Sequence, residues 1–138
     1  MLKGIPKIIS PELLKILHEM GHGDEIVLCD ANCPAHGLNN KCIYCAVTSA
    51  PELADAILKL MPLDTYAKPV FLMELVPGDS ADTSNWDEYE AVIKKHTNDD
   101  IEHIERFAFY ERMKSAYAVV ITSDIRPYGN IILKKGVF

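Results

Sequence analysis

A histidine between two glycines is the first residue whose type and setting could serve catalysis. His22 stands in the segment Gly21-His22-Gly23, where the flexible glycine backbone allows an imidazole to project into a cleft. Histidine gains and loses protons near neutral pH, so it can act as a general acid and a general base. The alternative is structural, because a single histidine can also pack against or cap a helix end.

Asp30 and the segment Tyr128-Gly129-Asn130 could hold a polar ligand. Asp30 follows the apolar run 25–29, and loops after strands of α/β proteins present ligand-binding groups. Its carboxylate can accept hydrogen bonds from hydroxyl groups. The other segment offers a phenol, backbone groups and a side-chain amide, as in a sugar-binding loop. Both also have an ordinary alternative, because aspartate caps turns and Gly-Asn is common turn sequence.

Four cysteines lie close together in the sequence. Cys29, Cys33, Cys42 and Cys45 have the spacing C-x3-C-x8-C-x2-C, and four thiolates can bind a structural zinc ion. Tetrahedral zinc sites usually join two close pairs, whereas Cys29 lies inside an expected strand and three residues separate it from Cys33. We therefore favour free, partly buried thiols, with no metal site and no disulfide.

Short apolar runs alternate with amphipathic stretches and predict strands and helices in turn. Helix starts are expected where Ser10 and Ser49 each precede a Pro and a Glu. The expected helices cover 11–20, 49–61, 86–93 and 107–116, and the expected strands cover 25–29, 42–47, 70–76, 101–104, 117–122 and 131–133. This alternation predicts one layered α/β domain over residues 1–138, with a mixed sheet between helices on both faces.

The overall composition is that of a globular protein and argues against several classes. The 138 residues are 49% hydrophobic and 25% charged, and their net charge is −6. These values argue against disorder and against a nucleic-acid-binding surface. No apolar run reaches the roughly 18 to 20 residues that span a bilayer, and the first residues lack the apolar region of a signal peptide. We therefore expect a cytoplasmic protein without nucleic-acid or membrane partners.

Four long segments resemble the RbsD/FucU family, and its FucU branch in particular. They are LKGIPKIISPELLKILHEMGHGDEIVLCDANCPAHG, LMPLDTYAKPVFLMELVPGD, IERFAFYERMKSAYAVVIT and YGNIILKKGV. The resemblance covers nearly the whole chain and implies the α/β/α fold of RbsD. It also implies an isomerase that interconverts the α and β anomers of L-fucose or a similar monosaccharide without a cofactor. Related members act as pyranases on ribose.

The resemblance assigns a role to individual residues. The proton-transferring histidine of the family falls on His22 in MGHGDE, and the substrate-binding aspartate falls on Asp30 in CDAN. Arg106 begins the segment RFAFYER, which is characteristic of the FucU branch and favours a fucose-like sugar. The sugar-binding loop of the family falls on Tyr128, Gly129 and Asn130, so the resemblance implies that these residues bind the substrate.

The segment 38–47 departs from the FucU pattern and contains two of the cysteines. The family forms homo-oligomers, including decameric rings, with sites near subunit contacts, so a homo-oligomer is implied. Two alternatives to the mutarotase remain at this point. One is a monosaccharide-binding protein without catalysis, and the other is a zinc-stabilised binding module.

Overall fold

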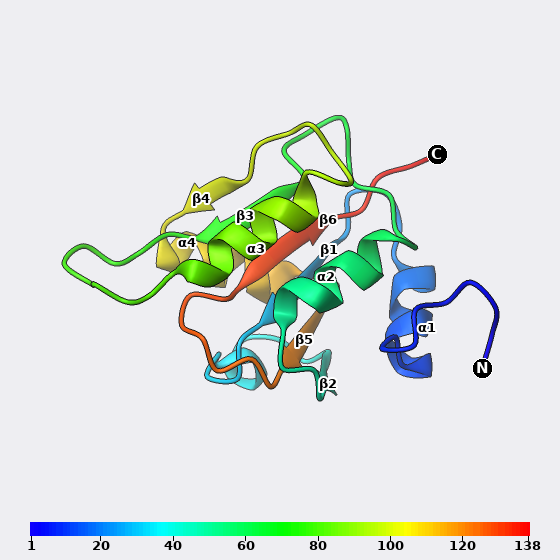
Figure 1. Cartoon of the computed structure of the whole chain (residues 1–138), viewed down its shortest axis with the longest axis horizontal. Coiled ribbons are helices and arrows are strands. Elements are labelled where there is room, and N and C mark those ends of the chain that lie inside the picture. Colours follow the sequence, from blue (N-terminus) through cyan, green and yellow to red (C-terminus); the bar gives the residue numbers. More distant parts are fainter.

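A mixed sheet of six strands in the order β2-β5-β1-β6-β3-β4 runs through the middle of the molecule (Figure 1). The computed structural model describes all residues 1–138. The strands are β1 (Glu25–Cys29), β2 (Cys42–Cys45), β3 (Val70–Met73), β4 (Glu102–Ile104), β5 (Ala118–Thr122) and β6 (Ile131–Lys134). The helices are α1 (Pro11–Glu19), α2 (Ala50–Leu58), α3 (Ser84–Ile93) and α4 (Arg106–Ser115), with a short 3-10 helix η1 (Ala35–Gly37).

Strand β6 runs against the other five strands. β1, β2 and β5 are mutually parallel, β3 is parallel to β4, and β6 pairs antiparallel with both β1 and β3. The amino end of β6 therefore lies beside the carboxyl ends of the other strands. We call this side of the sheet its carboxyl edge, and it gathers the loops that follow β1, β3, β4 and β5.

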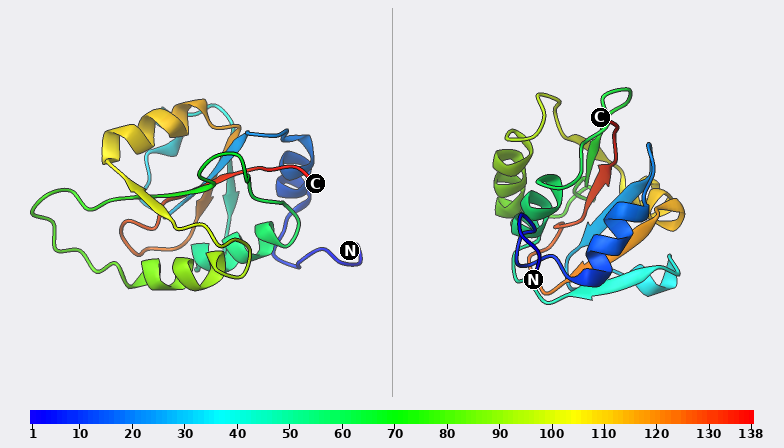
Figure 2. Two further views of the ribbon diagram at one scale, coloured as in Figure 1. Left: turned by 90° about the horizontal axis from the view of Figure 1, so that it is seen from above. Right: turned by 90° about the vertical axis from the view of Figure 1, so that its right-hand side faces the viewer.

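Each face of the sheet is covered by helices and carries its own apolar core. Alternate residues of a strand point to opposite faces, so Leu28 packs with α1, α2 and α3, whereas Val27 and Cys29 pack with α4 and η1. Figure 2 shows α4 on one side of the sheet and α2 and α3 on the other. The predicted α/β fold, with a mixed sheet between helical layers, is confirmed.

Helix capping by serine, which the sequence predicts, is present at both expected places. The Ser10 hydroxyl accepts a hydrogen bond from the Leu13 amide at 3.1 Å, and the Ser49 hydroxyl accepts one from the Glu52 amide at 3.3 Å. These caps fix where α1 and α2 begin. No helix of the structure has the length and apolar composition needed to cross a lipid bilayer.

The third expected strand is shorter than the sequence predicts. It was expected over 70–76, but β3 ends at Met73, because its neighbour β4 has only three residues and pairs with 71–73. After a last backbone hydrogen bond from the Glu74 amide to the Ile104 carbonyl at 2.8 Å, the chain leaves the sheet as a long projecting loop over 74–83 (Figure 1). This loop lies at the carboxyl edge.

Candidate functional site

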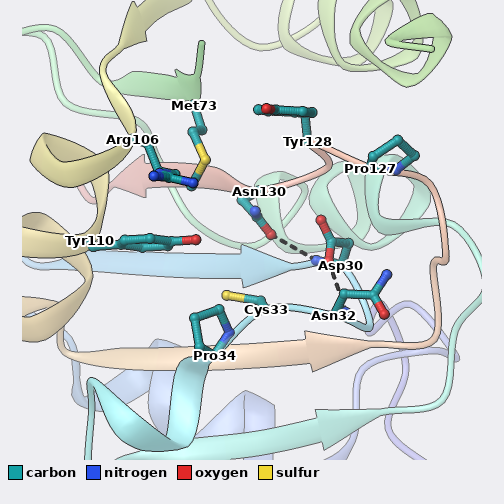
Figure 3. A pocket seen from close by; sticks show the side chains of 10 residues that line it. All are labelled: Asp30, Asn32, Cys33, Pro34, Met73, Arg106, Tyr110, Pro127, Tyr128 and Asn130. Atoms are coloured by element: carbon teal, nitrogen blue, oxygen red, sulfur yellow. Dashed lines mark hydrogen bonds between the residues drawn. The ribbon is translucent and has the colours of Figure 1, made fainter. Parts of the chain in front are cut away.

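A polar cavity of about 220 Å³ opens at the carboxyl edge of the sheet (Figure 3). It lies where β1 ends, β6 begins and α4 starts, so residues distant in the sequence meet in it. Four of the six site residues predicted from the sequence line it. The complete lining is Asp30, Asn32, Cys33, Pro34, Met73, Arg106, Tyr110, Pro127, Tyr128 and Asn130.

Asp30 occupies the floor of the pocket, directly after β1, and is only 4% exposed. One of its carboxylate oxygens accepts a hydrogen bond from the Asn32 amide at 2.9 Å. Burial raises the pKa of Asp30, and hydrogen bonds from the backbone of Asn32 and Gly129 partly oppose this rise. The carboxylate therefore has few partners within the protein and can accept hydrogen bonds from a ligand's hydroxyl groups.

Asn130 and Gly129 join the start of β6 to the end of β1. The side-chain oxygen of Asn130 accepts a hydrogen bond from the Asp30 amide at 2.9 Å, which leaves the amide nitrogen of Asn130 to donate elsewhere. Gly129 lies behind the pocket wall, and a Cβ atom there would approach the Asn85 side chain at 3.0 Å and Asp30 at 3.5 Å. Gly129, which the sequence analysis assigned to substrate binding, is not part of the cavity lining and packs closely against its neighbours instead.

Tyr128 is held in an uncommon backbone conformation at the rim of the pocket. Its φ angle is 55°, and it is the one non-glycine residue with positive φ. The Trp86 indole donates a hydrogen bond to the Tyr128 carbonyl at 2.9 Å, and the phenol donates one to Asp79 at 2.6 Å. Such conformations persist when their surroundings hold them, and they often occur at binding sites.

Arg106 brings a positive charge to the pocket from the first turn of α4. Glu105 caps this helix, because its carboxylate accepts a hydrogen bond from the Ala108 amide at 3.0 Å. The guanidinium points into the pocket (Figure 3), and its Nε is buried without a hydrogen-bond partner. A guanidinium that retains unused donors beside a buried carboxylate can bind neighbouring hydroxyl groups of a ligand.

Tyr110 and Met73 also line the pocket, although the sequence analysis did not single them out. Tyr110 lies four residues after Arg106 in α4, so both side chains project from the same face of the helix. That spacing was the signal that could have found it. Burial raises the pKa of Tyr110, so its hydroxyl stays protonated and can donate a hydrogen bond.

His22 lies outside this pocket. It precedes β1 whereas Asp30 follows it, and the five residues of that strand separate the two positions by roughly 17 Å. The His22 Nε2 is 3.1 Å from a carboxylate oxygen of Asp64, and its ring lies against Tyr66 with ring centres 5.3 Å apart. His22 is thus an oriented and partly exposed imidazole at the opposite edge of the sheet.

The four cysteines do not converge on one point. Cys29, Cys33 and Cys42 belong to the core beneath α4, whereas Cys45 packs into the core on the other face of the sheet. All four are free thiols, and no group of three or more His, Cys, Asp or Glu side chains is placed to hold a metal ion. The zinc-stabilised module therefore has no supporting geometry in this fold.

The fold and the pocket together define an α/β domain with a cavity suited to a small hydroxylated molecule at the carboxyl edge of its sheet. A carboxylate, a guanidinium, a side-chain amide and phenols surround a small cavity, and these groups match a ring that carries several hydroxyls. The model of the RbsD / FucU transport protein family matches residues 3–138. The chain belongs to this family.

Named relatives and solved structures agree with this membership. The L-fucose mutarotase of Actinobacillus pleuropneumoniae serotype 5b (strain L20) is 51% identical over 140 residues, covering 99% of this chain and 97% of that protein. The fucose mutarotase of Danio rerio is 48% identical over 145 residues, covering 99% of this chain and 94% of that protein.

Two solved structures carry bound sugars. The fucose mutarotase of Streptococcus pneumoniae, in complex with L-fucose, has 52% sequence identity and a TM-score of 0.92, with 99% of each chain covered. RbsD of Bacillus subtilis, complexed with D-ribose, has 25% identity and a TM-score of 0.77, with 100% of this chain and 99% of that chain covered. Both therefore share the fold over the whole chain.

Proposed function

We propose that this protein is a mutarotase that interconverts the α and β anomers of L-fucose or a similar monosaccharide. The convergence of Asp30, Arg106, Tyr128 and Asn130 on one small pocket carries the proposal. Relatives named L-fucose mutarotase or fucose mutarotase, about half identical over nearly the whole chain, support it. The structure with bound L-fucose supports the choice of sugar.

The pocket offers the sugar's hydroxyl groups both hydrogen-bond donors and hydrogen-bond acceptors. Arg106 and the amide nitrogen of Asn130 donate hydrogen bonds, and the Asp30 carboxylate accepts them. Tyr128 accepts through its phenol oxygen, because its own proton is donated to Asp79. Both anomers must bind and leave, so the pocket has to hold the parts of the ring that the two anomers share.

Anomer exchange requires two proton movements. The anomeric hydroxyl loses its proton, the ring oxygen gains one, and the bond between the anomeric carbon and the ring oxygen breaks. The free aldehyde then rotates, and the ring closes with the reverse proton transfers. An imidazole that protonates the ring oxygen and later removes that proton accelerates both steps by ~10² to 10⁴. We assign this role to His22.

We infer that His22 acts on a sugar bound in the pocket of a second subunit. Within one chain the imidazole and the pocket lie at opposite edges of the sheet, so a complete site needs His22 of the partner subunit. Exposed aromatic side chains lie beside His22 and beside the pocket. Tyr66 beside His22 is 79% exposed, and Phe107 next to Arg106 is 63% exposed. Exposed aromatic side chains of this kind are common at subunit contacts.

Anomer exchange measured by saturation-transfer NMR tests the proposed function. The wild-type protein should accelerate exchange of L-fucose, and a panel that includes D-galactose and D-ribose defines the sugar preference. A protein that binds L-fucose without accelerating exchange would instead be a non-catalytic binding protein. His22→Ala should lose at least a hundredfold in rate, and an unchanged rate would refute the assignment of His22.

Mixing two inactive variants tests whether the site is shared between subunits. His22→Ala retains an intact pocket, and Asp30→Asn retains an intact imidazole. If each site combines two chains, co-refolding the variants in equal amounts restores both groups at roughly a quarter of the sites. A mixture as inactive as either variant alone, with mixed oligomers demonstrated by mass spectrometry, would contradict the shared site.

A further inference from the structure

Cys33 places a thiol in the wall of the sugar pocket. It lies in the loop after β1, is partly exposed, and lines the cavity together with Asp30 and Tyr110 (Figure 3). Its sulfur contacts the Met113 sulfur at 3.9 Å. The proposed mutarotase reaction uses no thiol, so this group is available for other chemistry.

A second thiol lies directly behind the first. Cys29 is the last residue of β1 and is fully buried, and the Cys33 thiol lies near enough to affect its pKa. The two cysteines bracket a turn in which the Cys33 amide donates a hydrogen bond to the Asp30 carbonyl at 3.3 Å. Both side chains pack in the core beneath α4. The fold thus pairs one pocket thiol with one buried thiol.

We propose that Cys33 is a site of reversible oxidation by hydrogen peroxide and that Cys29 resolves it to an intramolecular disulfide. The Cys33 sulfur attacks the peroxide, so an S–O bond forms, the O–O bond breaks and water leaves. The Cys29 sulfur then attacks the sulfenic acid, so an S–S bond forms and a second water leaves. Two thiols supply the two electrons that reduce one peroxide to two waters.

The order of these two steps follows from the surroundings of each thiol. The neighbouring Cys33 thiol and burial raise the pKa of Cys29 well above its usual range, so Cys29 remains protonated and shielded from the peroxide. Cys33 is reached through the pocket. Cys42 is the other nearby thiol, but its sulfur donates a hydrogen bond to the Asn39 carbonyl at 3.2 Å. Cys29 is therefore the expected resolving residue.

Disulfide formation would alter the sugar site through Asp30. A disulfide brings its sulfurs to about 2.05 Å, which is closer than two thiol sulfurs in van der Waals contact. The contraction pulls on the turn between the cysteines, which contains Asp30 and its hydrogen-bond donor Asn32. This inference rests on the proposed function: disulfide formation places the mutarotase site under redox control.

The test treats the whole reduced protein with hydrogen peroxide and reads two signals. Peptide mapping by mass spectrometry should find a Cys29–Cys33 linkage with the loss of two hydrogens, and dithiothreitol should reverse it. L-fucose exchange, compared with that of the same protein before oxidation, should fall at least tenfold and recover on reduction. Cys33→Ser should form no such linkage, and its rate of L-fucose exchange after peroxide should equal its rate before peroxide.

Cys45→Ser is the matched control. Its thiol lies on the other face of the sheet, where it contacts the Ile8 carbonyl at 3.9 Å, so this variant should oxidise and lose activity as the wild type does. Linkage of Cys33 to Cys42, or an unlinked Cys33 after peroxide has consumed other thiols, would overturn the proposal. Loss of activity in oxidised Cys33→Ser equal to that of the wild type would also overturn it.

The two readouts also separate this proposal from the proposed function. If the reduced wild type does not accelerate anomer exchange, the mutarotase assignment fails, whereas the Cys29–Cys33 linkage is still decided by mass spectrometry. If exchange is normal and the linkage never forms, the redox proposal fails alone.

Discussion

The Asp79 carboxylate accepts a 2.6 Å hydrogen bond from the phenol of Tyr128, and this contact joins the projecting loop 74–83 to the rim of the sugar pocket. The same contact raises the pKa of Tyr128 and lowers that of Asp79. The phenol therefore stays protonated, with its proton directed toward the carboxylate. The phenol oxygen also accepts a hydrogen bond from the Val76 amide at 3.4 Å, which leaves one lone pair for a ligand. The orientation of the phenol depends on Asp79.

Removing the Asp79 carboxylate should weaken sugar binding. In Asp79→Ala the phenol loses its acceptor and can rotate, so we expect KM for L-fucose to rise about five- to tenfold, as for the loss of one ordinary hydrogen bond. The value of kcat should change much less. Asp79→Asn retains an acceptor and should restore most of the affinity.

Asp82→Asn is the matched control for this loop. Asp82 accepts a hydrogen bond from the Ser84 amide and does not contact Tyr128, so this variant should keep the wild-type KM. Equal effects of the Asp79 and Asp82 substitutions would mean that the loop acts only through its general conformation.

Asp30→Asn should lose activity. It should also be more stable than the wild type, by an amount that depends on pH. Burial raises the pKa of Asp30 in the folded state, so between its unfolded and folded pKa values the folded protein binds more protons. Stability due to Asp30 therefore falls as pH rises through that window. An uncharged asparagine avoids this cost.

The pH series that checks this prediction compares urea unfolding of Asp30→Asn and wild type. The difference in unfolding free energy should increase in favour of Asp30→Asn as pH rises from below the usual range of an aspartate, and then level off above the folded pKa of Asp30. A difference that is constant with pH would show that the carboxylate carries no burial cost.

The sequence could predict which pocket residues lie at strand ends. It could not predict every residue that packs around the pocket. Asp30 and Asn130 flank apolar runs, so their position at strand ends was readable, and the strand pairing confirms that β1 and β6 are neighbours. Asp79 and Met73 reach the same place through a loop and an adjacent strand. Their contacts depend on which strands become neighbours, which no local pattern specifies.

The separation of His22 from Asp30 was also implicit in the sequence. An apolar run of strand length lies between them, and a strand places the residues on either side of it at opposite edges of the sheet. Family resemblance assigns both residues to one site. The proposed function, which places both residues in one site, therefore requires that they belong to different subunits.

Asp64 should orient His22 without contacting the sugar. It accepts the hydrogen bond from His22 at 3.1 Å and another from the Tyr66 amide at 3.1 Å. In Asp64→Asn the turn keeps its acceptor while the charge that fixes the imidazole is lost. We expect kcat to fall about tenfold with little change in KM, and a larger loss in Asp64→Ala. A change in KM alone would place Asp64 in binding instead.

Gly136 fixes the strap 62–65 that carries Asp64. The Gly136 amide donates a hydrogen bond to the Pro62 carbonyl at 2.8 Å, and a Cβ atom at Gly136 would stand 2.4 Å from the Leu63 carbonyl oxygen. Backbone atoms cannot yield as a flexible side chain does, so Gly136→Ala must displace the strap. We expect a loss of about 1 to 3 kcal/mol in unfolding free energy, as for an overpacked core.

Gly37→Ala provides the comparison, because a Cβ atom at Gly37 has no neighbour within 4 Å. Its unfolding free energy should stay within about 0.5 kcal/mol of the wild type. Urea unfolding at equal m-values measures both variants. Because the displaced strap carries Asp64, Gly136→Ala should also lower kcat under conditions in which it is fully folded, whereas Gly37→Ala should not. Equal urea midpoints for the two variants would show that the strap adapts to the added methyl group without strain.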